Sequence, residues 1–232
     1  QRALTRTVAS QPCRFLNIHE FQSQQLMAKF GVVVPESGVA ETADEAKAVA
    51  QSLNTEDLIV KAQILAGGRG QGRFTSGLKG GVHLCNSADE VQDFASKMLG
   101  FNLVTKQTGH DGRPCNKVMI AKRHFIRRES YFAILLNRKD GGAVMIGSKF
   151  GGMDIETVAH ETPDAIYRLP FSLDKGITAE QAREMASNIG FPLRALDKAT
   201  DQILKLQDLF IKTDATQVEI NPFVETSEGH VM

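Results

Sequence analysis

The feature that most constrains this chain is an apolar strand sequence that leads directly into a glycine-rich loop. Residues 58–65 read LIVKAQIL, and residues 66–72, AGGRGQG, follow at once. Glycine lacks a Cβ, so the backbone of such a loop can approach a ligand closely and turn its N–H groups toward an anion. Lys61 and Arg69 add positive charge before and within the loop. The pattern predicts a clamp for polyphosphate, with a solvated hairpin tip as the alternative.

The loop differs from two common nucleotide-binding motifs. It lacks the Gly-Lys-Ser/Thr ending of a P-loop, and its glycines do not follow the GxGxxG spacing of dinucleotide folds. The loop alone therefore indicates a phosphate ligand without identifying it.

Composition allows a substantial core and gives no overall charge. The 232 residues are 42% hydrophobic and 23% charged, which suits one large domain or two small lobes. Lys plus Arg and Asp plus Glu both number 27, so no global field favours nucleic acid or an anionic membrane. Any anion site must be local. No apolar run is long enough to cross a bilayer, and we expect a soluble protein.

The cysteines and the N-terminus indicate the compartment. Cys13, Cys85 and Cys115 show no paired spacing, which argues against a disulfide framework and a structural zinc site and favours a reducing compartment. Residues 1–16 contain three arginines, several Ser and Thr, and no acidic side chain. That composition is typical of the end of an organellar transit peptide and predicts mitochondrial import. A disordered N-terminal extension is the alternative.

Helix start signals occur at three places. Thr42, Ser87 and Thr178 are each followed three residues later by Glu or Gln, as in a capping box. Two further helices are expected near 17–30 and 195–212, where apolar residues recur at helical spacing. Glycines stand at the ends of three of these segments, where helices commonly stop.

Apolar runs typical of strands lie between the helices, and they follow no regular βαβ period. The class expected is therefore α+β, built as lobes, and not a doubly wound sheet. The loop at 109–114, with two glycines and a proline, is the predicted junction between lobes. The expected strands are 58–65, 81–85, 117–121, 131–137, 143–148 and 216–221.

A second polar pattern lies near the end of the chain. In residues 216–222, TQVEINP, strand alternation places Gln217, Glu219 and Asn221 on one face. Side-chain oxygens are hard ligands suited to Mg²⁺, which usually takes one or two protein ligands beside water and nucleotide phosphates. Pro222 is expected to end the strand. The alternative is an edge strand with a solvated polar face.

Other charged residues carry no clear chemistry from sequence alone. Arg127, Arg128 and Glu129 form a run that resembles an ordinary surface cluster. The six histidines show neither metal-ligand spacing nor a triad arrangement.

Six ordered segments resemble the β subunits of succinyl-CoA synthetase (succinate–CoA ligase), in their N-terminal ATP-grasp domain. The resemblance runs from about Leu16 to the last residue. The segments are NIHEFQSQQL from Asn17, VKAQILAGGRGQG from Val60, SGLKGGV from Ser76, VTKQT from Val104, GGMDIE from Gly151 and VEINPF from Val218.

The resemblance implies an ATP-grasp fold in which two α+β lobes clamp a nucleotide. The smaller lobe would comprise about residues 35–119, and the larger lobe 17–34 plus 120–232, together the ATP-grasp domain 17–232. The family's C-terminal CoA-ligase domain would follow beyond Met232, as would a second Mg²⁺ ligand, an Asp. This portion alone is therefore expected to be inactive.

The same resemblance assigns roles to individual residues. Phosphates would be held by Lys61 and the backbone of Gly68, Arg69 and Gly70. The ribose would bind Glu129. Backbone groups from Met119 to Lys122, including Ile120 and Lys122, would read the base, because Ala121 stands where many bacterial members carry a Glu. Asn221 and Glu219 would be Mg²⁺ ligands, with Glu219 also a catalytic carboxylate near the transferred phosphate.

The activity implied is the reversible conversion of succinate, CoA and ATP to succinyl-CoA, ADP and phosphate in the tricarboxylic acid cycle. It would proceed through a phosphohistidine on a partner α subunit, in a heterodimer or heterotetramer of the mitochondrial matrix. Pro35 and the segments RRESYFAI and ETPDAIYRLP resemble the ADP-forming type. A GDP-forming version, a malate or citrate CoA ligase subunit, and a non-catalytic interaction subunit remain as alternatives.

Overall fold

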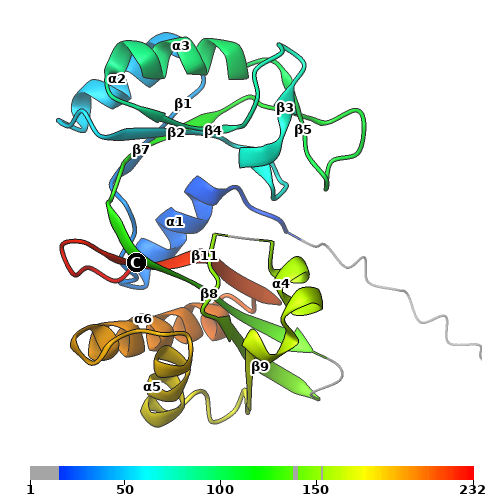
Figure 1. The fold of residues 1–232 in the computed structure, drawn as a ribbon, viewed down its shortest axis with the longest axis vertical. Coiled ribbons are helices and arrows are strands. Elements are labelled where there is room, and N and C mark those ends of the chain that lie inside the picture. Colours follow the sequence, from blue (N-terminus) through cyan, green and yellow to red (C-terminus); the bar gives the residue numbers. More distant parts are fainter. Residues whose placement is uncertain (1–15, 138–140, 153) are drawn as a thin grey trace, which may run out of the picture.

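The computed structural model describes residues 16–137, 141–152 and 154–232. These residues form two lobes, with helix α1 (Glu20–Lys29) between them (Figure 1). The predicted leader, residues 1–16, lies outside the described residues except for Leu16.

The first lobe is an antiparallel sheet covered on one face by two helices (Figure 1). Its strand order is β1-β7-β2-β4, and β7 lies between β1 and β2. Buried Ala, Val and Leu residues of the sheet and helices form one hydrophobic cluster. The elements are β1 (Ser37–Ala40), β2 (Leu58–Ala62), β4 (Val82–Cys85), β7 (Val118–Lys122), α2 (Ala43–Ser52) and α3 (Ala88–Met98).

A small three-stranded sheet extends the same lobe, in the order β3-β5-β6. It consists of β3 (Arg73–Phe74), β5 (Asn102–Val104) and β6 (Arg113–Pro114), with the single turn η1 (Arg69–Gln71) before β3. The predicted lobe junction at 109–114 is therefore wrong, because this segment closes the β5–β6 hairpin within the first lobe.

The chain passes to the second lobe after β7. All of β7, 118–122, pairs within the first sheet. The crossing therefore falls at 123–125, just beyond the boundary expected near residue 119. The connection is short, and β8 starts at Ile126.

The second lobe is an antiparallel sheet in the order β10-β9-β8-β11, packed against α5 and α6. The prediction that Pro222 ends the last strand is wrong: pairing shifts register after Ile220 and resumes at Phe223 opposite Ser130. The elements are β8 (Ile126–Asn137), β9 (Gly142–Ser148), α4 (Ile155–Glu161), η3 (Pro163–Ala165), β10 (Ile166–Phe171), α5 (Ala179–Asn188), α6 (Leu193–Lys212) and β11 (Gln217–Thr226).

The predicted helices form, but their capping differs in detail. Thr178 and Gln181 make the reciprocal capping box. Thr42 and Ser87 cap α2 and α3 through their hydroxyls, whereas the side chains of Glu45 and Glu90 accept from the N–H of the residue before the cap.

Helix α1 differs from the amphipathic helix expected at 17–30. None of its residues is fully buried. Leu26, Met27 and Phe30 are half-buried and pack against the core of the second lobe. The helix therefore belongs by packing to the second lobe, while its first turn lies near the first.

The described helices include none long and apolar enough to span a membrane. Cys85 and Cys115 are buried free thiols, and burial raises the pKa of both.

Candidate functional site

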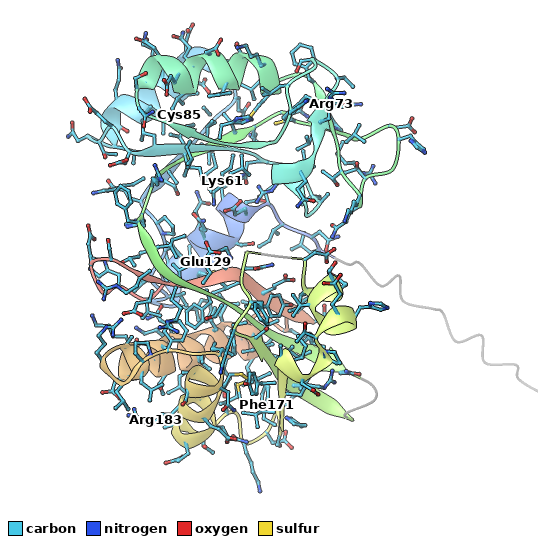
Figure 2. All side chains as sticks on the ribbon, in the orientation of Figure 1. Lys61, Arg73, Cys85, Glu129, Phe171 and Arg183 are labelled. Carbon is cyan, nitrogen blue, oxygen red and sulfur yellow. The ribbon has the colours of Figure 1, made fainter. Side chains whose placement is uncertain are left out.

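Two predicted phosphate-binding cations meet at one carboxylate. Lys61 lies on β2, paired with Val82 and Met119, and its Nζ is 2.9 Å from Glu20 Oε1. Arg69, at the start of η1, forms an ion pair with the other oxygen of Glu20 and donates to the carbonyl of Ala62 at 2.7 Å. Figure 2 shows Lys61 at the edge of the first lobe that faces α1. The structure thus brings together one residue from the strand before the loop and one from within the loop.

Glu20 is strongly acidic in this setting. Burial by itself would raise its pKa, but the positive charges of Lys61 and Arg69 and their hydrogen bonds outweigh it and lower the pKa to about 2. The carboxylate therefore stays ionised at any physiological pH.

The glycine-rich loop begins after Lys61 and contains Arg69, and most of its residues are exposed. Gly68 has a φ of +70°, a conformation that residues with a Cβ seldom adopt. The loop is held at its start by Gln107, whose Oε1 accepts from the N–H of Gly67 at 2.7 Å. Beside the loop lies an open hollow of about 530 Å³, lined among others by Gly70, Arg73 and Lys79. An anionic ligand here would lie beside two further cations, Arg73 and Lys79.

In the second lobe, two polar side chains, Glu129 and Asn221, lie beside Gly151 and Gly152. The N–H of Gly152 donates to Asn221 Oδ1 at 2.7 Å. A Cβ on Gly152 would lie 2.7 Å from Glu129 Oε2, and one on Gly151 would lie 2.5 Å from the backbone of Ser130. The two glycines therefore let this segment press against β8, and they bring Glu129 and Asn221 to the same place.

Glu219 lies two residues before Asn221 on β11. Its Oε2 accepts from Gln217 Nε2 at 2.9 Å, which agrees with the predicted polar face of this strand. Partial burial raises the pKa of Glu219, an effect that the hydrogen bond from Gln217 partly offsets. Burial raises the pKa of Tyr131 on β8, and the negative charges of Glu219 and Glu156 raise it further.

The start of α4 carries a further carboxylate, Asp154. Asp154 caps α4, accepting from the N–H of Glu156 at 3.3 Å and from the hydroxyl of Thr157. Hydrogen bonds lower its pKa, and the positive charge of Lys106, in the β5–β6 connection of the first lobe, lowers it further. The first lobe thus presents cations, and the second lobe presents carboxylates, on sides that lie near one another.

The expected base-reading connection is mostly enclosed by the sheet. Ile120 has no exposed surface. The N–H of Lys122 donates to the carbonyl of Glu36 at 2.9 Å, although its side chain is exposed. The backbone of Ile120 lies between β1 and β2, so within this connection the exposed side chain of Lys122 is the part open to a ligand, and base reading here stays a prediction.

The oxygens of the second lobe suit a hard cation. The carboxylate of Glu219 and the amide oxygen of Asn221 lie on one strand, and Mg²⁺ needs only one or two such ligands beside phosphate and water. Among the described residues, no group of three or more His, Cys, Asp or Glu side chains is arranged to hold a metal ion by itself. The residues therefore fit a cation shared with a phosphate ligand better than an all-protein metal site.

Sequence reasoning missed Glu20, Gln107 and Gly152. Each lies in one of the six segments quoted above, but each bonds to a residue far along the chain. The separations are 41 residues for Glu20 and Lys61, 40 for Gln107 and Gly67, and 69 for Gly152 and Asn221. One signal could have found Glu20, since it is the sole acidic residue within 17–30.

Comparisons with known proteins identify the family of this chain. Residues 17–225 match the ATP-grasp domain family. The chain is 54% identical over 219 residues to the mitochondrial succinate–CoA ligase (ADP-forming) subunit beta of Dictyostelium discoideum, covering 94% of this chain and 49% of that protein. It is 50% identical over 221 residues to the mitochondrial succinate–CoA ligase (GDP-forming) subunit beta of Mus musculus, covering 95% and 51%. The chain spans about half the length of these curated relatives.

Among solved structures, ATP citrate lyase from Methanothrix soehngenii has a similar fold. The TM-score is 0.65 at 20% sequence identity, over 92% of this chain and 48% of that chain. At this identity the likeness concerns the fold alone.

The chain belongs to the ATP-grasp family, and the expected α+β fold of two lobes is confirmed. Within that family it is similar to the β subunits of succinate–CoA ligases, both ADP-forming and GDP-forming. The resemblance carried by the six sequence segments is thereby confirmed.

Proposed function

We propose that this chain is the nucleotide-binding part of a succinate–CoA ligase β subunit. The observation that carries the proposal is that Lys61 and Arg69 lie together at a glycine-rich loop, each bound to Glu20. The chain that contains them is 54% identical to such a subunit. The nucleotide would lie between the cations of the first lobe and the oxygens of the second.

The residues of the first lobe would hold the phosphates. Lys61, Arg69 and the N–H groups of Gly68 and Gly70 would face the phosphate oxygens, because charged donors and free backbone N–H groups bind them most strongly. Phosphoryl transfer depends mainly on positioning and on offsetting charge, so this edge would serve both binding and reaction.

The residues of the second lobe would hold the sugar and the metal. Glu129 would accept hydrogen bonds from the ribose, and the exposed Lys122 side of the connection would lie along the base. Asn221 and Glu219 would hold Mg²⁺, which when bound neutralises charge on the phosphates. Glu219, with its raised pKa, would also lie beside the phosphoryl group in transfer.

The reaction proposed for the whole protein is succinate + CoA + ATP to succinyl-CoA + ADP + phosphate, reversibly. A partner α subunit would supply the phosphohistidine, and the pair would work in the mitochondrial matrix. The mitochondrial relatives support the organelle, and the subunit name of those relatives supports a second subunit.

Calorimetric titration of this chain with Mg-ADP and Mg-GDP in parallel tests the nucleotide site. We expect binding of both to depend on Lys61, with ADP preferred. Preference for GDP would reverse the ADP-forming assignment and would match the GDP-forming relatives. Failure to bind either nucleotide would contradict the proposed function.

The acid substrate needs the full-length protein with its partner subunit. We expect turnover with succinate and ATP. Turnover with malate or citrate in place of succinate would assign the chain to a related CoA ligase.

A further inference from the structure

The proposed function leaves Glu20 without a role, although its carboxylate joins both phosphate-binding cations. Oε1 accepts from Lys61 Nζ at 2.9 Å and from Gln24 Nε2 at 3.4 Å, and Oε2 accepts from the guanidinium of Arg69. The side chains of Glu20 and Lys61 are each 23% exposed, and that of Arg69 is 19% exposed. Three charges are thus largely withdrawn from water together, which strengthens their interaction.

The two cations would repel each other without this carboxylate. Lys and Arg side chains are long and lose much rotamer freedom when they are fixed in place. Arg69 has a second anchor in the carbonyl of Ala62, whereas among the described residues the side chain of Lys61 bonds to Glu20 alone. Removal of the charge on Glu20 would therefore free Lys61 first.

Glu20 is itself held firmly enough to position others. It lies in the first turn of α1, whose later residues pack on the second lobe. The N–H of the next residue, Phe21, donates to Oε1 of Gln63, a buried side chain on the chain just after β2. The start of α1 is thus fixed against the strand that carries Lys61.

We propose that Glu20 is a positioning residue of the phosphate site, which holds Lys61 and Arg69 in the orientation that a polyphosphate requires. The inference rests on the proposed nucleotide function. An ammonium group has three N–H donors and a guanidinium has five, so donors remain on both cations after they bind Glu20. The three side chains together keep a net charge of +1, which still attracts phosphate. Ordering the cations in advance lowers the entropic cost of binding.

Glu20→Gln is the direct test, because it removes the charge at almost constant size. Titrations would compare Mg-ADP with adenosine, which lacks the phosphates. We expect Mg-ADP to bind roughly tenfold more weakly and adenosine to be unaffected, since a hydrogen bond to a charged group contributes on that scale. Glu56→Gln, which removes one exposed carboxylate from the same lobe, is the matched control and should change neither affinity.

A double-mutant cycle with Lys61→Met tests whether Glu20 acts through Lys61. In the Lys61→Met background, we expect Glu20→Gln to weaken Mg-ADP binding clearly less than it does in the wild type. Should Glu20→Gln fold poorly, Glu20→Asp keeps the charge on a shorter stem and should restore part of the affinity.

The outcomes separate this inference from the proposed function. A wild-type chain that fails to bind Mg-ADP contradicts the function itself. Wild-type binding with equal or tighter binding by Glu20→Gln overturns the positioning role, since the carboxylate would then be neutral toward phosphate or compete with it. Equal losses for Mg-ADP and adenosine also overturn it, because they indicate a general structural effect.

Discussion

Acidic side chains on the two sides of this site lie in opposite electrostatic settings. Glu20 meets the cations of the first lobe, and its pKa falls to about 2. In the second lobe the pKa of Glu219 is raised by partial burial, and that of Glu156 by its hydrogen bond with Asp154. One residue type thus serves as a permanent counterion on one side and as a weaker acid on the other. The neighbours, and not the residue type, decide which.

Two glycine positions of the loop after β2 and one before α4 show a similar contrast. In the first lobe, a Cβ added to Gly68 or Gly70 would meet nothing within 4 Å, so these positions leave space for a ligand. In the second lobe, a Cβ on Gly151 would lie 2.5 Å from the backbone of Ser130. Glycine therefore leaves open space at Gly68 and Gly70 and allows close packing at Gly151.

The largest effect is expected for the pH dependence of stability at Glu20. A carboxyl group whose pKa falls from 4.5 to about 2 on folding stabilises the folded state above pH 4.5, by up to about 3 kcal/mol. That contribution is lost as the pH falls from about 4.5 to 2. Denaturant unfolding of the wild type and Glu20→Gln should therefore differ most near pH 7 and converge near pH 2. A difference that does not change with pH would contradict the counterion setting.

Loss of the cation on β2 should have the next largest effect. Lys61→Ala should weaken Mg-ADP binding by roughly 1.5–3 kcal/mol, the range for a hydrogen bond to a charged group. Calorimetric titration measures this directly. Lys175→Ala removes an exposed lysine of the second lobe and is the control. Equal affinities for Lys61→Ala and the wild type would remove Lys61 from the phosphate site.

The contrast between glycines can be tested with two single methyl groups. Gly151→Ala should destabilise the fold by about 1–3 kcal/mol, because the added Cβ overlaps the backbone of β8. Gly70→Ala should leave unfolding almost unchanged, since the space around it is open and its φ is not in the left-handed region. Thermal unfolding of both variants is the measurement. Similar losses at the two positions would break the comparison.

The smallest effect is expected at Glu219, and its sign should be opposite to that at Glu20. A raised pKa in the folded state means that the proton is favoured there. The stability of the wild type relative to Glu219→Gln should be greatest below pH 4.5 and should fall as the pH rises through the folded pKa. Unfolding of both proteins across pH 3–7 would measure this slope. A slope of the same sign as at Glu20 would contradict the difference between the lobes.

Prediction from sequence succeeded where the signal was local. Thr178 with Gln181 specified a capped helix, and the apolar residues of α6 faced the core as expected. It failed where pairing decides the structure. Strand β1 has only four residues, and it exists because it pairs with β7 about eighty residues later. Pro222 did not end β11, because a register shift accommodates it.

The candidate site divides in the same way. The sequence by itself determined a glycine-rich loop after β2 and an oxygen-bearing face on β11, since glycine spacing and strand alternation are properties of neighbouring residues. Only the tertiary structure decided that Glu20 lies between Lys61 and Arg69, and that Gly152 joins Glu129 to Asn221. These contacts connect residues far apart in the chain. They depend on how helix α1 and the two sheets pack, which no local pattern specifies.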